Sequence, residues 1–200
     1  KITPTMHEQA AGFAAEGYAK VSGGLGLAIA TSGPGAMNLL TAVANCYYDS
    51  VPVVFLVGNA PMAFSRPNKH VRQPGFQEAP VAEMVRPIVK YEATIRNVWA
   101  VRFEVERALW SATEGRPGPV FLDIPSDVQK MAMPDADDGM AFKAPAPAEW
   151  THQFDSIDAF AAKYREALQK AQRPVVLVGG GVGRSLYARE TLADLLAVTA

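Results

Sequence analysis

Glu8 is the first residue of the chain whose type and position could do chemistry. It stands at the start of HEQAAGFAAEGYAKVSGG, residues 7–24, a stretch rich in alanine, glycine and aromatic residues. A carboxylate in the first turn of a helix is stabilised by the helix dipole, which makes it a common surface feature. The small residues behind it would also let a ligand lie against this helix end and pair with the carboxylate. Both interpretations are open on these residues alone.

A glycine-rich turn is the second candidate. TSGPGAMN, residues 31–38, follows a predicted strand and opens a predicted helix. Its two glycines would let the backbone approach a flat or anionic ligand at the carboxyl end of a parallel strand. Gly-Pro-Gly is equally common as a simple tight turn, and the GKS or GKT of a phosphate-binding Walker motif is absent.

Other motifs fail on spacing. GGGVGRS, residues 179–185, would need glycine at position 184 to match the dinucleotide fingerprint, and Arg184 stands there. No G-x-S-x-G is present, so a hydrolase elbow is not supported. We therefore predict no metal site, because the histidines and the cysteine lack the spacing of ligands: His7, His70, His152 and Cys46.

Composition excludes several classes of protein. The chain has 200 residues, of which 49% are hydrophobic and 20% charged, which is typical of a globular protein. The net charge is -1 and no basic stripe is visible, so nucleic acid is not an expected partner. No run approaches the roughly 20 apolar residues of a membrane span, and the N-terminus has no signal-peptide plan. We expect no membrane association.

Two single residues bear on location and length. Cys46 falls within an apolar helical pattern, which indicates a core residue rather than a disulfide partner. A reducing compartment follows, and we expect the cytoplasm. Lys1 is not preceded by an initiator Met, so we expect the chain to be part of a longer protein.

The candidate residues need elements to position them. Short continuous apolar runs predict buried strands, and a strand, a glycine-rich turn, a helix and a second strand make a βαβ unit with a parallel sheet. An irregular segment at 59–78 is longer than most connections, and such loops are often functional. The predicted strands lie at 25–30, 52–58, 115–125 and 174–183, and the predicted helices at 7–22, 36–48, 97–113, 157–171 and 186–198.

A domain boundary is predicted where periodicity is lost. Residues 130–150 gather Pro, Ala and Asp, the composition of a linker. We expect one domain over residues 1–129 and the start of a second α/β domain over residues 151–200. Asp155 and Ser156 are placed to cap the first helix of that second domain.

Several segments together resemble the thiamine-diphosphate enzymes of the acetolactate synthase group. The similarity runs from His7 to Gln129 and is weaker over 174–183. It rests on segments in matching order and spacing: HEQAAGFAAEGYAK, a short strand, TSGPGAMNLLTAVANCYYDSVPVVFLVG, GFQE and GRPGPVFLDIPSDVQ. The resemblance implies a doubly wound, parallel-sheet domain over 1–129 that binds the cofactor's aminopyrimidine, without its first strand and helix, and a truncated middle domain over 151–200. A third domain, which binds the diphosphate through Mg²⁺, would lie outside this chain.

The resemblance also implies roles for single residues. Glu8 aligns with the family's glutamate that hydrogen-bonds N1′ of the aminopyrimidine and so promotes loss of the C2 proton. That role requires a carboxylate that shares a proton at neutral pH, so we expect Glu8 to be buried with a raised pKa. The backbone of the SGPG turn would pack against the ring, with Asn38 near it. The turn is made of Ser32, Gly33, Pro34 and Gly35.

Three further residues are implied at the reacting end. Gln77 aligns with a catalytic glutamine that reaches the thiazolium side of the site. Phe76 beside it and Lys90 align with the substrate entrance, although a solvated surface position explains Lys90 equally well. The activity implied is decarboxylation of a 2-oxo acid such as pyruvate and transfer of its two-carbon unit. Thiamine diphosphate and Mg²⁺ would be required, and some relatives also bind FAD.

Departures from related types refine this expectation. No His-His pair is present, which favours carboligases over enzymes of the pyruvate decarboxylase type, and Glu8 argues against the glyoxylate carboligase type. Asn59 and Met6 replace a common Gln and a frequent Arg, which leaves the substrate open.

The family's site lies between subunits, so we expect a homodimer or homotetramer and no activity from these 200 residues alone. The alternatives are the pyrimidine-binding subunit of a split enzyme that needs a partner chain, and a flavin- or nucleotide-binding module that uses residues 179–185.

Overall fold

The structure of the chain is a computed structural model that describes residues 2–64, 71–133, 140–146, 156–184 and 186–199. The chain divides into two compact units, residues 1–144 and 145–200. No helix among the described residues is both long enough and apolar enough to cross a membrane.

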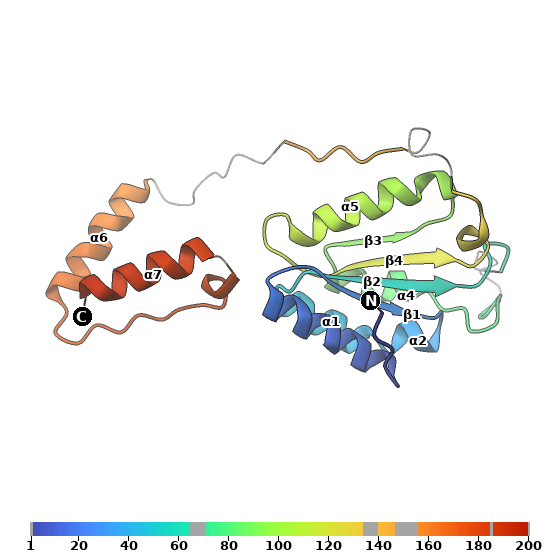
Figure 1. The fold of residues 1–200 in the computed structure, drawn as a ribbon, viewed down its shortest axis with the longest axis horizontal. Coiled ribbons are helices and arrows are strands. Elements are labelled where there is room, and N and C mark those ends of the chain that lie inside the picture. The colour runs from blue at the N-terminus through green and yellow to red at the C-terminus, as the bar shows by residue number, and fades with distance from the viewer. Residues whose placement is uncertain (1, 65–70, 134–139, 147–155, 185, 200) are drawn as a thin grey trace. The chain divides into compact units, whose positions relative to one another are not determined.

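The first unit is built on a four-stranded sheet in which all neighbouring strands are parallel (Figure 1). The strand order is β1-β2-β4-β3, so the carboxyl ends of all four strands lie at one edge. This confirms the predicted parallel sheet. The strands are β1 (Gly26–Ala30), β2 (Val53–Asn59), β3 (Tyr91–Thr94) and β4 (Val120–Pro125).

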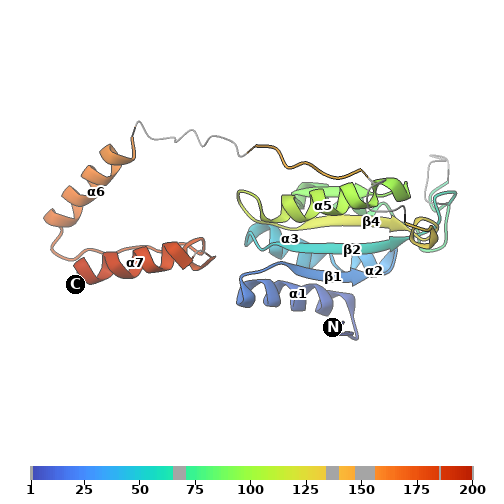
Figure 2. The same cartoon turned by 45° about the horizontal axis from the view of Figure 1, so that its top comes forward.

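Helices cover both faces of this sheet, as the prediction of a doubly wound α/β fold requires. Figure 2 shows α5 on one side of the strands and α1 on the other. One buried cluster packs α1, α3 and α4 against one face of the sheet, and a second packs α5 against the other face. The helices are α1 (Glu8–Ser22), α2 (Pro34–Met37), α3 (Leu40–Tyr48), α4 (Val81–Val85) and α5 (Val101–Thr113).

Helix α1 begins and ends as its sequence predicts. The side chain of His7 accepts a hydrogen bond from the backbone N–H of Gln9 (3.1 Å), which caps the first turn. Gly23 ends the helix in the left-handed conformation, with φ 70°. These two ends place Glu8 in the first turn of the helix.

Some helices and strands of the first unit differ from the prediction. The helix expected over 36–48 is broken into α2 and α3, and the N–H of Leu39 bonds to the carbonyl of Ala36 (3.1 Å), a tighter turn than an α-helix makes. The prediction missed α4 and β3, which have five and four residues. Elements so short and partly exposed show too few apolar repeats to be recognised.

Strand β1 is buried on one face only, so the prediction of a fully buried strand is wrong there. Leu27 is 57% exposed and Ile29 is 54% exposed, while Ala28 between them is buried. Alternate side chains point to opposite faces of a sheet. Leu27 and Ile29 therefore lie on the face of the sheet that carries α5. They are exposed because α5 packs over β2, β3 and β4.

In the second unit the described residues form two α-helices, α6 (Ile157–Lys170) and α7 (Leu186–Thr199). Helix α6 begins at Ser156, one of the two predicted capping residues, whose side chain accepts a hydrogen bond from the N–H of Ala159 (2.9 Å). The other, Asp155, lies outside the described residues. The strand predicted over 174–183 does not form, and Val175 is 93% exposed and Leu177 96% exposed. A strand needs neighbours for its backbone groups, and the described part of this unit contains no strand to pair with it.

Candidate functional site

Glu8 and Asn38, thirty residues apart in sequence, meet at the carboxyl edge of the sheet. Glu8 opens α1, and Asn38 follows α2, the short helix after the turn that leaves β1. The side-chain amide of Asn38 donates a hydrogen bond to Oε2 of Glu8 at 3.0 Å. This bond fixes the orientation of the carboxylate from one of its two oxygens.

The glycine-rich turn lies directly against this pair. A Cβ placed on Gly35 would stand 2.7 Å from Cγ2 of Thr31 and 3.3 Å from Oε1 of Glu8. Only glycine therefore lets the turn approach the carboxylate without displacing Thr31. Ser32 and Pro34 belong to the same turn, so the structure gathers the predicted cofactor-binding residues around Glu8.

The loop that carries Gln77 joins the same group through its backbone. Gly33 has φ 57°, and a Cβ there would stand 1.9 Å from the backbone oxygen of Gln77. Gln77 itself has a positive φ of 54°. Phe76 beside it is 87% exposed. The turn and the loop therefore touch main chain to main chain, and Phe76 projects away from the protein surface.

The electrostatics of Glu8 differ from the expectation. The hydrogen bond from Asn38, followed by one from the backbone of Glu8 itself, lowers the pKa of the Glu8 carboxyl, and the small desolvation does not offset them. Glu8 is partly exposed. The prediction of a buried Glu8 with a raised pKa is therefore wrong for this chain, because a donor faces one oxygen and little covers the carboxylate.

Lys90 does not join the group. It precedes β3 and so lies at the amino edge of the sheet, opposite Glu8. Its ammonium donates to the backbone oxygen of Glu114 (2.5 Å), and its stem packs against Gly118, where a Cβ would stand 3.0 Å from Cδ of Lys90. Burial lowers the pKa of Lys90.

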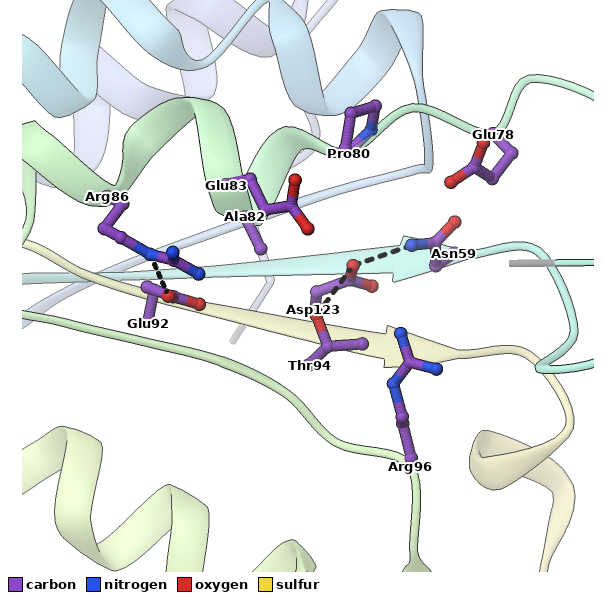
Figure 3. Close-up of a pocket in the computed structure, with 10 residues that line it drawn as sticks. All are labelled: Asn59, Glu78, Pro80, Ala82, Glu83, Arg86, Glu92, Thr94, Arg96 and Asp123. Atoms are coloured by element: carbon purple, nitrogen blue, oxygen red, sulfur yellow. Dashed lines mark hydrogen bonds and ion pairs between the residues drawn. The ribbon is translucent and has the colours of Figure 1, made fainter. Parts of the chain in front are cut away.

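The prediction missed Asp123, a buried acid in β4 that is 4% exposed. Burial raises the pKa of Asp123 to about 6, against the opposing effect of hydrogen bonds from Asn59 and Thr94 (Figure 3). The sequence signal is an acid within VFLDIP, an otherwise apolar strand. Such an acid must be paired or protonated when the strand is buried on both faces.

A second buried group behaves as predicted. Cys46 is buried in α3, and desolvation raises the pKa of its thiol to about 12. It is therefore a core residue and an inert thiol. Among the described residues, no group of three or more His, Cys, Asp or Glu side chains is arranged to hold a metal ion.

Comparison with known proteins identifies one matching family and several similar proteins. Residues 1–83 match the family described as thiamine pyrophosphate enzyme, N-terminal TPP binding domain. The chain is 37% identical over 199 residues to acetolactate synthase 3, chloroplastic, of Brassica napus, covering 96% of this chain and 28% of that protein. It is 37% identical over 181 residues to acetolactate synthase, chloroplastic, of Arabidopsis thaliana (88% of this chain, 25% of that protein).

A third relative is also much longer than this chain. The chain is 38% identical over 185 residues to acetolactate synthase 1, chloroplastic, of Zea mays, covering 90% of this chain and 27% of that protein. The chain thus spans between 25% and 28% of the length of these relatives.

Proposed function

Since the chain belongs to the thiamine pyrophosphate enzymes and is acetolactate synthase-like, we propose that it forms the aminopyrimidine-binding part of a carboligase. The enzyme decarboxylates a 2-oxo acid such as pyruvate and transfers the two-carbon unit to an acceptor. The observation that carries this proposal is the hydrogen bond from Asn38 to Glu8, which orients a carboxylate beside Gly35 at the carboxyl edge of the sheet.

The residues present fit the cofactor's flat ring. The glycine-rich turn brings main chain, without intervening side chains, next to the carboxylate, and a Cβ on Gly35 would fill that approach. When bound, thiamine diphosphate supplies the carbanion chemistry, and the protein supplies binding and orientation. Glu8 would hold a proton at its carboxylate and share it with a ring nitrogen, and Asn38 would keep that carboxylate aimed.

The residues nearest the thiazolium ring and the substrate are assigned to the loop after β2. Gln77 would reach toward the thiazolium side, since its backbone packs on Gly33 next to Glu8. Phe76, being exposed, would present an apolar surface to the substrate. Lys90 is left out of this group because it lies at the opposite edge of the sheet.

Other requirements are part of the same proposal. Mg²⁺ and the diphosphate would be held by residues outside this chain, and the site would be completed in a homo-oligomer of at least two subunits. FAD binding and cytoplasmic location stay predictions, and the plant relatives are named as chloroplastic. In those relatives the matching segment is part of a much longer chain, which supports a single-chain enzyme over a split one.

Exchange of the cofactor's C2 proton tests the role of Glu8. In the full-length protein with thiamine diphosphate and Mg²⁺, Glu8→Gln should slow this exchange by about 100-fold or more, because an amide cannot take up and release the proton. Glu114→Gln removes an exposed carboxylate at the opposite edge and should leave the rate unchanged. Near-normal exchange in Glu8→Gln would remove Glu8 from its assigned role.

A further inference from the structure

Helix α1 carries an apolar stripe on the side that faces away from its own domain. Figure 2 shows α1 as the outermost element on its side of the sheet. Tyr18 is 64% exposed and Val21 is 91% exposed, while the buried residues of the helix lie on the opposite side. Surface helices normally turn polar residues outward. The stripe consists of six exposed residues: Ala10, Phe13, Ala14, Gly17, Tyr18 and Val21.

No charged residue interrupts this stripe. Helix α1, all of which the structure describes, has three charged residues. Glu8 opens the helix and Glu16 is buried. Lys20, beside the stripe, donates to Glu16 (2.6 Å) and to Asp49 (2.7 Å). A continuous apolar surface of this kind marks an interaction site, and its partner must be apolar as well.

Gly17 indicates that the partner's main chain comes close. Glycine in the middle of a helix lowers its stability relative to alanine, so its presence needs a reason. Gly12 in the same helix has one within the chain, because a Cβ there would stand 2.5 Å from Cβ of Ala42. A Cβ on Gly17 would meet nothing within 4 Å. The reason for Gly17 therefore lies outside the described residues, where its bare surface lets another helix approach.

The stripe is complementary to a copy of itself. With about 3.6 residues per turn, its small residues form a central line along the helix, with Phe13 on one side of that line and Tyr18 on the other. The positions 10, 13, 14, 17, 18 and 21 have a spacing that is the same from either end. When a second copy is related by a two-fold axis between positions 15 and 16, Phe13 lies over Gly17 of that copy, and Tyr18 lies over its Ala14. The two helices then run antiparallel, which their dipoles favour.

The exposed area suits a contact between subunits. From their exposed fractions, the three large side chains of the stripe offer roughly 400 Å² per chain, and a standard interface buries about 800 Å² per partner. Two further exposed apolar residues lie near the ends of the helix. Met6 lies just before α1, and Tyr48 ends α3, which the bond from Lys20 to Asp49 ties to the last turn of α1. With these two residues the contact approaches the size of a stable interface.

We propose that a second copy of this chain docks on the stripe, with the two α1 helices packed antiparallel about a two-fold axis. The proposal rests on the homo-oligomer of the proposed function and names the surface that joins its subunits. Because Glu8 opens α1, the pairing would set the two candidate sites at opposite ends of one helix pair.

Cysteine cross-linking of the full-length protein tests the pairing. About the proposed axis, the two copies of position 14 are about 5 Å apart along the helices, and those of position 10 are about 16 Å apart. Ala14→Cys should therefore link to its own copy through a short bifunctional thiol reagent. Ala10→Cys, also exposed on the stripe, is the matched control and should not. A link between two copies of one position, identified by mass spectrometry, can join only separate chains, and Cys46 is buried.

Gly17→Leu gives a second measurement. In the single chain its side chain would project into open space, so the fold should be kept, but it would hold two paired helices apart. We expect the dissociation constant of the full-length dimer, from sedimentation over serial dilution, to rise at least about tenfold. Thr113→Leu adds the same side chain to an exposed position of α5 and should leave that constant unchanged.

A monomeric full-length protein, a dimer without the link at position 14, an equal link at position 10, or no weakening by Gly17→Leu would overturn the proposal. A dimer without the link that still exchanges the cofactor's C2 proton would leave the proposed function standing, because another surface would then join the subunits. A link at position 14 in a protein that shows no exchange would support the pairing and contradict the proposed function.

Discussion

Gly33 is the residue at which the structure makes its sharpest prediction about the assembly of the site. Its backbone has φ 57° and ψ -117°, a combination that side chains other than hydrogen rarely allow. A Cβ there would lie 1.9 Å from the backbone oxygen of Gln77 and 2.8 Å from its carbonyl carbon. Gly33→Ala therefore meets both backbone strain and a rigid neighbour.

The two effects can be given a magnitude. Holding alanine in such a conformation costs about 1–3 kcal/mol. The contact with Gln77 involves main chain and not the end of a flexible side chain, so the turn and the loop must separate, which adds at least about 1–2 kcal/mol of lost packing. A total of about 3 kcal/mol, divided by a urea slope of about 2 kcal/mol/M, lowers the midpoint of urea unfolding by about 1.5 M.

Gly115 provides the matched control. It has a similar φ of 60°, but a Cβ there would meet nothing within 4 Å. Gly115→Ala should cost only the strain of the left-handed region, about 1 kcal/mol, or about 0.5 M in the urea midpoint. Circular dichroism during urea titration of both variants measures the difference. Equal shifts in the two variants would refute the close contact between Gly33 and Gln77.

The remaining predictions concern protons at three buried or partly exposed groups. Asn38→Ala removes the donor to Glu8, so the pKa of that carboxyl should rise and the pH profile of C2 proton exchange should shift to higher pH; an unchanged profile would contradict the pairing. The folded-state pKa of Asp123 is raised from 3.8 to about 6, so its contribution to stability is present below pH 4 and lost as pH rises through 6. Urea unfolding should therefore show a loss of up to about 3 kcal/mol across this range that is absent in Asp123→Asn. Cys46, whose pKa is raised to about 12, should react with a disulfide reagent only on unfolding; rapid reaction of the folded chain would contradict its burial.

Long elements with a regular apolar pattern were predictable, and short ones were not. The apolar periodicity of α1 and the two glycines that follow it predicted its bounds, and the apolar runs of β2 and β4 predicted a parallel sheet that the structure confirms. Strand β3 has four partly buried residues, YEAT, and its place at the edge of the sheet comes from pairing with β4. That pairing is a tertiary contact and leaves no periodic trace in so short a segment.

The candidate site divides in the same way. The glycines of the SGPG turn and Glu8 were visible because their types are unusual in their context. The contact between Gly33 and Gln77 joins segments more than forty residues apart and could be inferred only through resemblance. Asp123 was missed because the role of an acid in an apolar strand depends on which side chains hydrogen-bond to it. Here these are Asn59 and Thr94 on neighbouring strands.

The pKa of Glu8 connects the geometry of this chain to the proposed assembly. Within the chain the hydrogen bond from Asn38 lowers that pKa, and the carboxylate is partly exposed. Proton sharing with a ring nitrogen near neutral pH requires a higher value, which desolvation provides. A flat ring laid against the turn, with a second subunit above it, would remove water from Glu8 while Asn38 keeps it aimed. In the proposed enzyme the chain would therefore supply the orientation of the acid, and the assembly would supply the burial that makes it reactive.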